Sequence, residues 1–275
     1  MEKSFLLIGG DNRLNYLYQS IKNKGFIVSH IYSKRFEDCE KALEKIENAN
    51  IIILPIPLTQ DKRHIFTPLC DKRLLIEEVV KRAKANTIIF GGGEHILFEN
   101  NKNYINILLN EEMTLKNAYA TAEATLAIIE EKSPTTIRGS NFSILGYGRI
   151  GKALGHILKL LGPNVTVFAR RAEVLKEAVN DGLMAHNISQ INEYLKNSDI
   201  IINTIPHLVL TDKELKLLNN ETVIIDLASR PGGVDFIAAR KYGLNTIHAL
   251  SLPGKFSPKS AAEYIEEAIF KNLNF

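Results

Sequence analysis

Short hydrophobic runs alternate with amphipathic stretches along most of the chain. The runs predict β-strands over residues 4–8, 26–32, 50–54, 87–90, 142–145, 165–168, 199–204, 222–227 and 245–249. Between many of them, apolar residues recur three and four positions apart, which places them on one face of a helix. Strands and helices that alternate at this spacing form parallel sheets with helices on both faces. The pattern therefore predicts an α/β protein.

The alternation stops at residues 110–132, where we predict one long helix. Asn110 is a good N-cap, acidic residues follow it in the first turn, and Ser133-Pro134 ends the helix. We predict two open parallel-sheet, Rossmann-like domains joined by this crossing helix. The first comprises residues 1–115 and a C-terminal helix, within 258–275, that returns to it; the second comprises residues 116–257.

A glycine-rich turn follows the strand predicted over 142–145. Its sequence is Gly146-Tyr147-Gly148-Arg149-Ile150-Gly151, and a helical pattern and a second strand follow it. This is the context of a dinucleotide-binding fingerprint. Gly146 permits a tight turn, Gly148 lets the backbone approach a pyrophosphate, and Gly151 lets the helix pack close to the strand. With the helix N-terminus directed at the phosphates, we expect cofactor contacts from Gly146, Gly148, Arg149, Ile150 and Gly151. The alternative is a tight turn that binds nothing.

The end of the second strand bears on which dinucleotide binds. An NAD site usually has an acidic residue there, which holds the ribose 2′-hydroxyl. This chain has Arg170 and Arg171 instead, and its first acidic residue is Glu173. Two guanidinium groups would pair with a 2′-phosphate, which a carboxylate would repel. The sequence therefore favours NADP over NAD and argues against S-adenosylmethionine. The alternative is that one of these arginines is only a solvated surface charge.

Composition and charge exclude several other classes of protein. The 275 residues are 45% hydrophobic and 24% charged, and 34 basic against 31 acidic residues give a net charge of +3. That balance, without a basic tract, does not indicate a nucleic-acid partner. We expect no signal peptide, no membrane span and no metal site, because no apolar run is long enough and the histidines are scattered. Cys39 and Cys70 suit a reducing cytoplasm and are expected to be inert.

We expect binding and catalytic residues in the loops that follow the predicted strands, because open α/β sheets bind ligands at the carboxyl ends of their strands. In the second domain we expect further cofactor contacts from Thr204, Ile205, Pro206, Ala228 and Ser229. Arg230 could hold a substrate carboxylate or the cofactor with its planar fork, or form a salt bridge between loops. Lys255 could bind a carboxylate or polarise an imine, or be a surface lysine. His207 is a weaker choice for a proton shuttle.

Two further charged residues lie in the glycine-opened turn after the first strand. Asp11 and Arg13 could contact the substrate, or could simply cap the helix that follows. We therefore predict a catalytic set of Arg230, Lys255, Arg13 and Asp11.

Several segments together resemble the A-subunit family of dipicolinate synthase, from endospore-forming bacteria. The most specific match is residues 226–236, Asp-Leu-Ala-Ser-Arg-Pro-Gly-Gly-Val-Asp-Phe. Other matching stretches cover nearly the whole chain; they are 9–13, 51–55, 121–125, 145–151, 202–206, 252–254 and 258–259. The chain departs from the family pattern at His207 and around Tyr119 and Ala120. More broadly, the architecture is similar to that of the 2-hydroxyacid dehydrogenases.

The resemblance implies oxidation of a cyclic dicarboxylate, 4-hydroxy-tetrahydrodipicolinate or its dihydro form, to dipicolinate. The hydride would pass to NADP⁺ as the ring becomes aromatic, and Arg230, Arg13 and Lys255 could pair with the two carboxylates. A flavoprotein-like B-subunit of the same synthase, a homo-oligomer and the cytoplasm of the sporulating mother cell are also expected. Two alternatives stay open. A 2-hydroxyacid dehydrogenase would need a histidine where this chain has Pro253-Gly254-Lys255, and a dinucleotide-binding subunit would have no turnover of its own.

Overall fold

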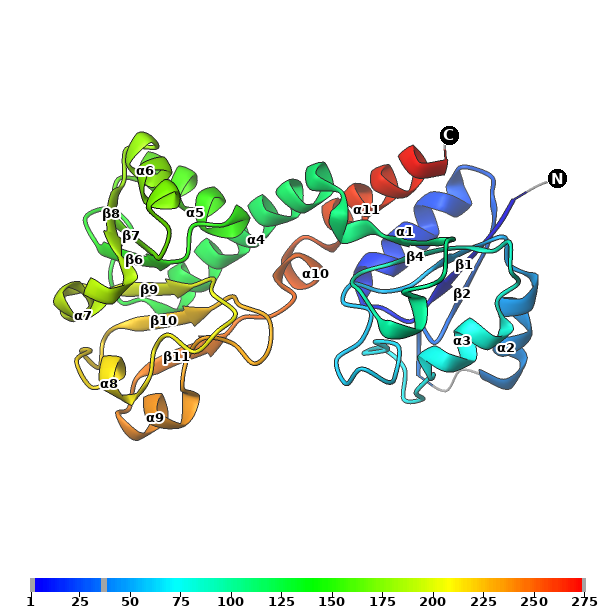
Figure 1. Ribbon diagram of the computed structural model, residues 1–275, viewed down its shortest axis with the longest axis horizontal. Coiled ribbons are helices and arrows are strands. Elements are labelled where there is room, and N and C mark those ends of the chain that lie inside the picture. The colour runs from blue at the N-terminus through cyan, green and yellow to red at the C-terminus, as the bar shows by residue number, and fades with distance from the viewer. Residues whose placement is uncertain (1–2, 36–38, 274–275) are drawn as a thin grey trace. The chain divides into compact units, whose positions relative to one another are not determined.

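The computed structural model describes residues 3–35 and 39–273, which divide into two compact α/β units (Figure 1). The first unit contains the chain up to residue 117 and again from residue 254, and the second contains residues 118–253. The predicted boundaries lay instead after residues 115 and 257. We describe each unit by itself.

The first unit has a parallel sheet in the order β2-β1-β3-β4-β5. Its strands are β1 (Ser4–Ile8), β2 (Ile27–Ile31), β3 (Ile51–Ile53), β4 (Ile88–Gly91) and β5 (Tyr104–Asn106). Its helices are α1 (Asn12–Asn23), α2 (Cys39–Asn48), α3 (Ile76–Arg82), α10 (Leu252–Phe256, entering from the second unit) and α11 (Pro258–Leu273), with 3-10 turns η1 (Ile96–Phe98) and η2 (Ile107–Leu109).

Alternating side chains of β1 supply both cores of this unit. Phe5 and Leu7 pack in one cluster with residues of α1 and α11, whereas Leu6 and Ile8 pack in another with residues of α2 and α3. This alternation is what a strand covered on both faces requires. The C-terminal helix therefore returns to the first domain, as predicted, and completes one face of its sheet.

The second unit has a six-stranded parallel sheet in the order β11-β10-β9-β6-β7-β8. Its strands are β6 (Asn141–Leu145), β7 (Asn164–Ala169), β8 (Met184–Asn187), β9 (Ile200–Asn203), β10 (Val223–Asp226) and β11 (Asn245–His248). Its helices are α5 (Arg149–Leu161), α6 (Ala172–Asn180), α7 (Ile191–Tyr194), α8 (Asp212–Leu215) and α9 (Phe236–Lys241), with 3-10 turns η3 (Ile188–Gln190) and η4 (Leu195–Asn197).

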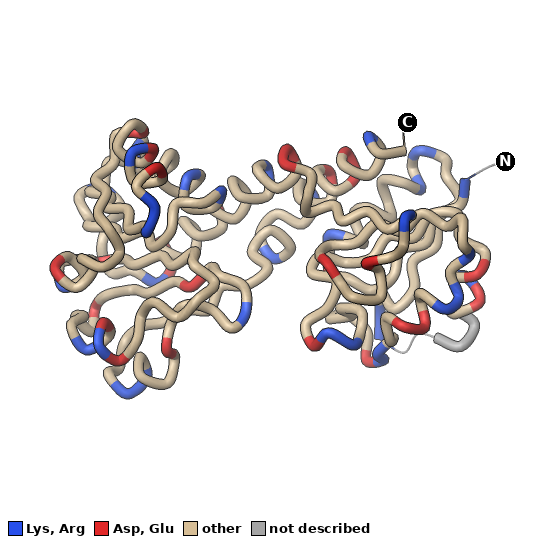
Figure 2. The backbone as a smooth tube through the Cα atoms, viewed as in Figure 1, with Lys and Arg blue, Asp and Glu red and all other residues tan. Residues whose placement is uncertain are grey.

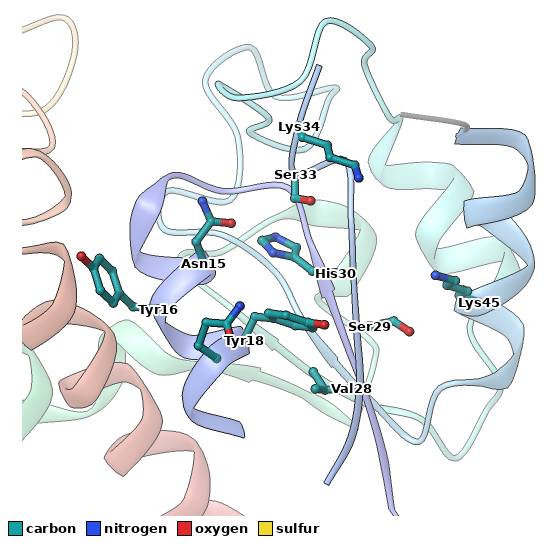
Figure 3. Close-up of a pocket in the computed structure, with 10 residues that line it drawn as sticks. Asn15, Tyr16, Tyr18, Val28, Ser29, His30, Ser33, Lys34 and Lys45 are labelled. Atoms are coloured by element: carbon teal, nitrogen blue, oxygen red, sulfur yellow. The ribbon is translucent and has the colours of Figure 1, made fainter. Parts of the chain in front are cut away.

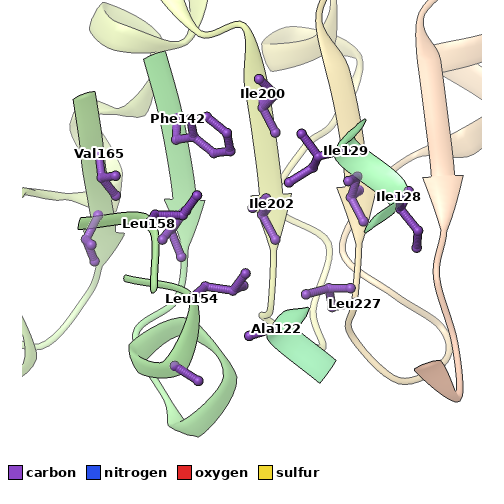
Figure 4. Close-up of a cluster of buried hydrophobic side chains, with 14 of the residues drawn as sticks. Ala122, Ile128, Ile129, Phe142, Leu154, Leu158, Val165, Ile200, Ile202 and Leu227 are labelled. Carbon is purple, nitrogen blue, oxygen red and sulfur yellow. The ribbon is translucent and has the colours of Figure 1, made fainter. Parts of the chain in front are cut away.

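Two hydrophobic clusters lie on the two faces of this sheet. In the first, Phe142 and Ile202 pack with Leu154 of α5 and Ile129 of the long helix α4 (Glu111–Lys132) (Figure 4). The second contains Leu145 and Phe168 with residues of α7, α8 and α9. Because both faces are buried, the central strands are almost wholly apolar, which is why the sequence revealed them.

The long helix α4 begins as predicted. The Asn110 side chain accepts a hydrogen bond from the Met113 N–H at 2.9 Å, which caps the helix. Its residues are divided between the two units after Asn117. Leu115, in the first half of this helix, is exposed.

Three elements were not anticipated from the sequence. The edge strands β5 and β8 are short and half-exposed, so they lack a hydrophobic run. The segment around Pro253 and Gly254, expected as a loop, forms the short helix α10. Proline is tolerated there because the first turn of a helix does not use its N–H.

Charged residues of both signs are interspersed along both units (Figure 2). Within the described ranges, no helix combines the length and apolar character that a bilayer span requires. Cys70 is a half-buried free thiol; the expectation for Cys39 concerns a side chain outside the described part.

Candidate functional site

The glycine turn between β6 and α5 has the geometry of a phosphate-binding turn. Gly146 has φ +90° and lies so close to the β9 loop that a Cβ there would be 2.5 Å from Thr204 Oγ1. A Cβ on Gly151 would collide with the Gly146 carbonyl oxygen, whereas Gly148 has nothing within 4 Å of where its Cβ would be. Gly148 is also the N-cap of α5, and no side chain caps that helix. These features fit a pyrophosphate at the helix N-terminus.

The residue between the first two glycines anchors the turn. Tyr147 is buried, and its hydroxyl donates a 2.7 Å hydrogen bond to Asp181 Oδ2. Burial raises the pKa of the Tyr147 hydroxyl well above its usual range, and the bond to Asp181 raises it further. The same bond is the main reason that the pKa of Asp181 is lowered. Sequence reasoning missed this anchor, because its two members lie far apart in the chain.

Tyr147→Phe is expected to lower the free energy of unfolding by about 1.5–3 kcal/mol at pH 7, the usual contribution of a hydrogen bond to a charged group. Because the pKa of Asp181 is lowered in the folded state, the contribution of this bond is present above the unfolded value of about 3.9. It is lost as the pH falls through the folded value. Urea unfolding of both proteins at pH 7 and at successively lower pH measures the difference.

A matched control is the exposed pair formed by Tyr242 and Asp212, whose hydroxyl–carboxylate distance is 2.8 Å. Asp212 is 55% exposed, so water replaces the lost bond and Tyr242→Phe is expected to cost under about 0.5 kcal/mol. Equal losses in the two variants would contradict the anchoring role of Tyr147.

The two arginines after β7 are exposed. Arg170 follows the buried Ala169 directly, and Arg171 is the N-cap of α6. Among the described residues neither guanidinium has an acidic partner, so both are available to an anion. Their contact with a 2′-phosphate stays a prediction, and so does the alternative that one is a solvated surface charge.

The loops after β9 and β10 contain the other predicted cofactor residues and Arg230. Because β10, β9 and β6 are neighbours in one parallel sheet, these loops lie at the same edge as the glycine turn. Thr204 donates to the Leu145 carbonyl at 2.9 Å, which joins the β9 loop to the end of β6. Arg230 is exposed, and no ion partner for it exists within the described part of the chain. The predicted residues in the loops after β9 and β10 therefore lie at the same edge of the sheet as those of the glycine turn. His207 is exposed and follows Pro206.

The predicted residues of the first unit form a packed pair. Asp11 caps α1 by accepting from the Arg13 N–H at 3.1 Å, and it binds the Arg13 guanidinium through two 2.8 Å hydrogen bonds. Arg13 also donates to the Ile56 carbonyl and is only 4% exposed. A Cβ on Gly254 would lie 3.0 Å from Arg13 Nε and against the Asp11 carboxylate. Asp11 thus caps the helix, and a substrate contact of Asp11 or Arg13 stays a prediction, while Lys255 beside Gly254 is exposed.

A cavity of about 470 Å³ lies elsewhere in the first unit, along the edge strand β2 (Figure 3). His30 lies in its middle and hydrogen-bonds the Gly9 carbonyl at 2.8 Å. The exposed Lys34 and Lys45 stand at its rim. None of the predicted site residues lines this cavity.

Comparison with known proteins gives one family model for each part of the chain. Residues 112–236 match the NAD binding domain of D-isomer specific 2-hydroxyacid dehydrogenases, and residues 4–125 match the N-terminal domain of the dipicolinate synthase A-subunit. The second unit is therefore a dehydrogenase-type, dinucleotide-binding domain, which supports a nicotinamide dinucleotide as cofactor and an oxidoreductase as the class of protein.

Whole-chain comparisons give relatives of one particular kind. The dipicolinate synthase A-subunit of Bacillus subtilis (strain 168) is 29% identical over 283 residues, covering 97% of this chain and 94% of that protein. The crystal structure of the A-subunit from Bacillus halodurans has 26% identity and a TM-score of 0.86, with 99% of this chain and 98% of that chain covered. The crystal structure of the protein from B. subtilis has 26% identity and a TM-score of 0.84, with coverages of 100% and 96%. The chain is therefore similar along its whole length to the A-subunits of dipicolinate synthase.

More distant structures share the fold alone. The D-lactate dehydrogenase of Escherichia coli is 12% identical with a TM-score of 0.63, and it covers 98% of this chain and 96% of its own. The predicted fold class, two open parallel-sheet α/β domains, is thereby confirmed.

Proposed function

We propose that this protein oxidises the dihydro form of 4-hydroxy-tetrahydrodipicolinate to dipicolinate, with NADP⁺ as the hydride acceptor. Loss of water from the hydroxy compound gives the dihydro form. That form then gives up one hydride to the cofactor and one proton to water, which leaves an aromatic pyridine ring. The observation that carries the proposal is the glycine turn, open at Gly148, at the same sheet edge as the exposed Arg230.

The proposal gives the residues of the second unit separate roles. The first turn of α5 would hold the diphosphate, and Arg170 and Arg171 would hold the 2′-phosphate. The loops at 204–206 and 228–229 would orient the nicotinamide, which supplies the hydride acceptor when bound. Arg230 would bind one ring carboxylate with its planar guanidinium group. Lys255 belongs to the first unit, and its binding of a carboxylate stays a prediction. Because aromatisation drives the reaction, positioning is the main requirement of the protein.

The family name also motivates proposals about assembly. The relatives are named as one kind of subunit of a synthase, and we infer that a B-subunit, expected to resemble a flavoprotein, works with this chain. We also propose that the chain forms a homo-oligomer and that it works in the cytoplasm of the mother cell of a sporulating bacterium.

The test is formation of the reduced nicotinamide, followed by its absorbance. The full chain is mixed with NADP⁺ and freshly prepared diacid, with and without the B-subunit. Turnover with the diacid but not with 2-hydroxy acids is expected. If NADP⁺ raises the melting temperature but no reduced cofactor forms in either mixture, the chain binds the dinucleotide without turnover. Turnover of 2-hydroxy acids would favour the dehydrogenase alternative.

A further inference from the structure

A buried carboxylate lies at the end of β10, just before the Arg230 loop. Asp226 has no exposed surface. Its oxygens accept hydrogen bonds from Asn203 Nδ2 at 2.8 Å, from the Ala228 N–H at 3.1 Å and from the Gly233 N–H at 2.8 Å. Within the described ranges no cation forms an ion pair with it. Three neutral donors therefore hold this charge.

The two backbone bonds tie both ends of one loop to one side chain. Ala228 opens the segment that contains Arg230, and Gly233 closes it. Gly232 between them has φ +89°, and a Cβ there would be 2.5 Å from Asp226 Oδ2. The Gly232 N–H also donates to the Ser229 carbonyl at 2.9 Å. The loop is thus folded tightly over the Asp226 carboxylate, and only the outward Ser229, Arg230 and Pro231 are exposed.

Asn203 extends the network to the neighbouring strand. It is the β9 residue in register with Asp226 and is also fully buried. Its Nδ2 donates to the Ile205 carbonyl at 3.0 Å, and its Oδ1 accepts from the Ile205 N–H at 3.1 Å. Both N–H groups of the amide are used, so its orientation is fixed. One amide therefore holds the β9 loop and at the same time binds the carboxylate that holds the Arg230 loop.

A carboxylate is an unusual choice for this position if stability alone is considered. The preceding residues of β10, Val223, Ile224 and Ile225, are buried and apolar. Burying an ionised carboxylate among them costs free energy that hydrogen bonds must offset. What the carboxylate provides, and an apolar side chain cannot, is a fixed geometry for the two loop ends.

We propose that Asp226 and Asn203 form a positioning pair that couples the cofactor loop at 204–206 to the Arg230 loop. Neither residue touches the substrate. Asp226 fixes the position of the backbone of the Arg230 loop. Asn203 fixes the position of Ile205 relative to that loop. The inference rests on the proposed function, in which Arg230 binds the substrate and the 204–206 loop contacts the dinucleotide.

The first test is Asp226→Asn in the full chain. An amide at this position must turn its NH₂ toward at least one of the three donors, so one loop end loses its acceptor. We expect kcat for the diacid to fall by about 100-fold, with KM for NADP⁺ changed by less than about threefold. The matched control is Asp235→Asn. Asp235 also accepts two backbone N–H bonds, at 3.1 and 2.9 Å, but it caps α9 outside the loop, and kcat should stay within about twofold.

Asn203→Ser separates the two halves of the pair. A serine hydroxyl is too short to bridge to Ile205 and Asp226 together, while both backbone bonds of Asp226 are kept. We expect KM for NADP⁺ to rise by about tenfold, with a smaller loss of kcat than in Asp226→Asn. A role in folding alone would not produce opposite patterns of kcat and KM in the two variants.

Amide hydrogen exchange provides a readout that does not depend on turnover. The N–H groups of Ala228 and Gly233 should exchange slowly in the wild type and faster in Asp226→Asn, and remain slow in Asp235→Asn. If the wild type fails to oxidise the diacid, the proposed function fails, but these exchange rates still test the coupling. Unchanged kcat and unchanged exchange in a folded Asp226→Asn would overturn the proposal. If that variant does not fold, the kcat and KM pattern of Asn203→Ser decides: a change of KM by less than about twofold refutes the pair.

Discussion

Arg230→Ala is expected to lower kcat/KM for the diacid by about 10³-fold, with little change in dinucleotide affinity. A guanidinium that grips a carboxylate forms two charge-assisted hydrogen bonds of about 1.5–3 kcal/mol each. Their loss raises the barrier by about 4 kcal/mol, which corresponds to that change in rate. Because the side chain is exposed and makes no ion pair within the described ranges, the fold should be unaffected. Steady-state kinetics and dinucleotide titration measure the two quantities.

The matched control is Arg240→Ala. Arg240 is an equally exposed arginine in the last turn of α9 in the same unit, and its removal should leave kcat/KM within about twofold. Added guanidinium ion should restore part of the activity of Arg230→Ala. An Arg230→Ala protein as active as the control would remove Arg230 from the site.

Replacing Arg170 and Arg171 together by serine is expected to weaken NADP⁺ binding by about 10²- to 10³-fold and NAD⁺ binding by less than about threefold. The two dinucleotides differ only by the 2′-phosphate, so a change confined to NADP⁺ reports contacts to that group. Both arginines stand at the end of β7, where the adenosine ribose of a bound dinucleotide is expected. Binding is measured by titration, and independently by the shift of the melting temperature.

Lys176→Ser serves as the control for nonspecific loss of positive charge, because Lys176 is exposed on α6, the helix that Arg171 caps. It should leave both affinities within about twofold. A wild-type protein that binds NAD⁺ and NADP⁺ equally well would contradict the role of the arginine pair, whatever the variants do.

Burial decided how much of the fold could be predicted. Ile51–Ile53 and Ile200–Asn203 are buried along their whole length, and such strands appear as unbroken apolar runs. The edge strands Tyr104–Asn106 and Met184–Asn187 pair on one side only and are half-exposed. Such strands leave only a weak hydrophobic pattern, although the similarly half-exposed edge strands β2 and β11 were predicted.

The candidate site shows a similar limit. The glycine turn could be recognised because the positive φ of Gly146 and the contact of Gly151 with the Gly146 carbonyl oxygen arise within the motif. The close approach of Gly146 to the β9 loop could not be recognised in this way. The sequence identifies Asp11 and Arg13 as charged residues in one turn. Their spacing does not distinguish two residues that bind each other from two residues that bind a ligand. Asp181, the partner of Tyr147, and Asn203, a partner of Asp226, lie 34 and 23 residues away in the sequence. Only the folded chain therefore identifies those two anchors.

The place of α11 in the first unit bears on how the protein is made. Phe5 and Leu7 are covered partly by Ile265 and Ile269 of that helix, which is translated after residues 118–253. Until then, the sheet of the first unit has one apolar face that α1 covers only in part. Residues 118–253 contain their whole sheet in one continuous stretch and can fold in the meantime. Translation that stops before residue 258 would release a chain in which this apolar surface stays exposed. Chaperones and proteases act on such chains.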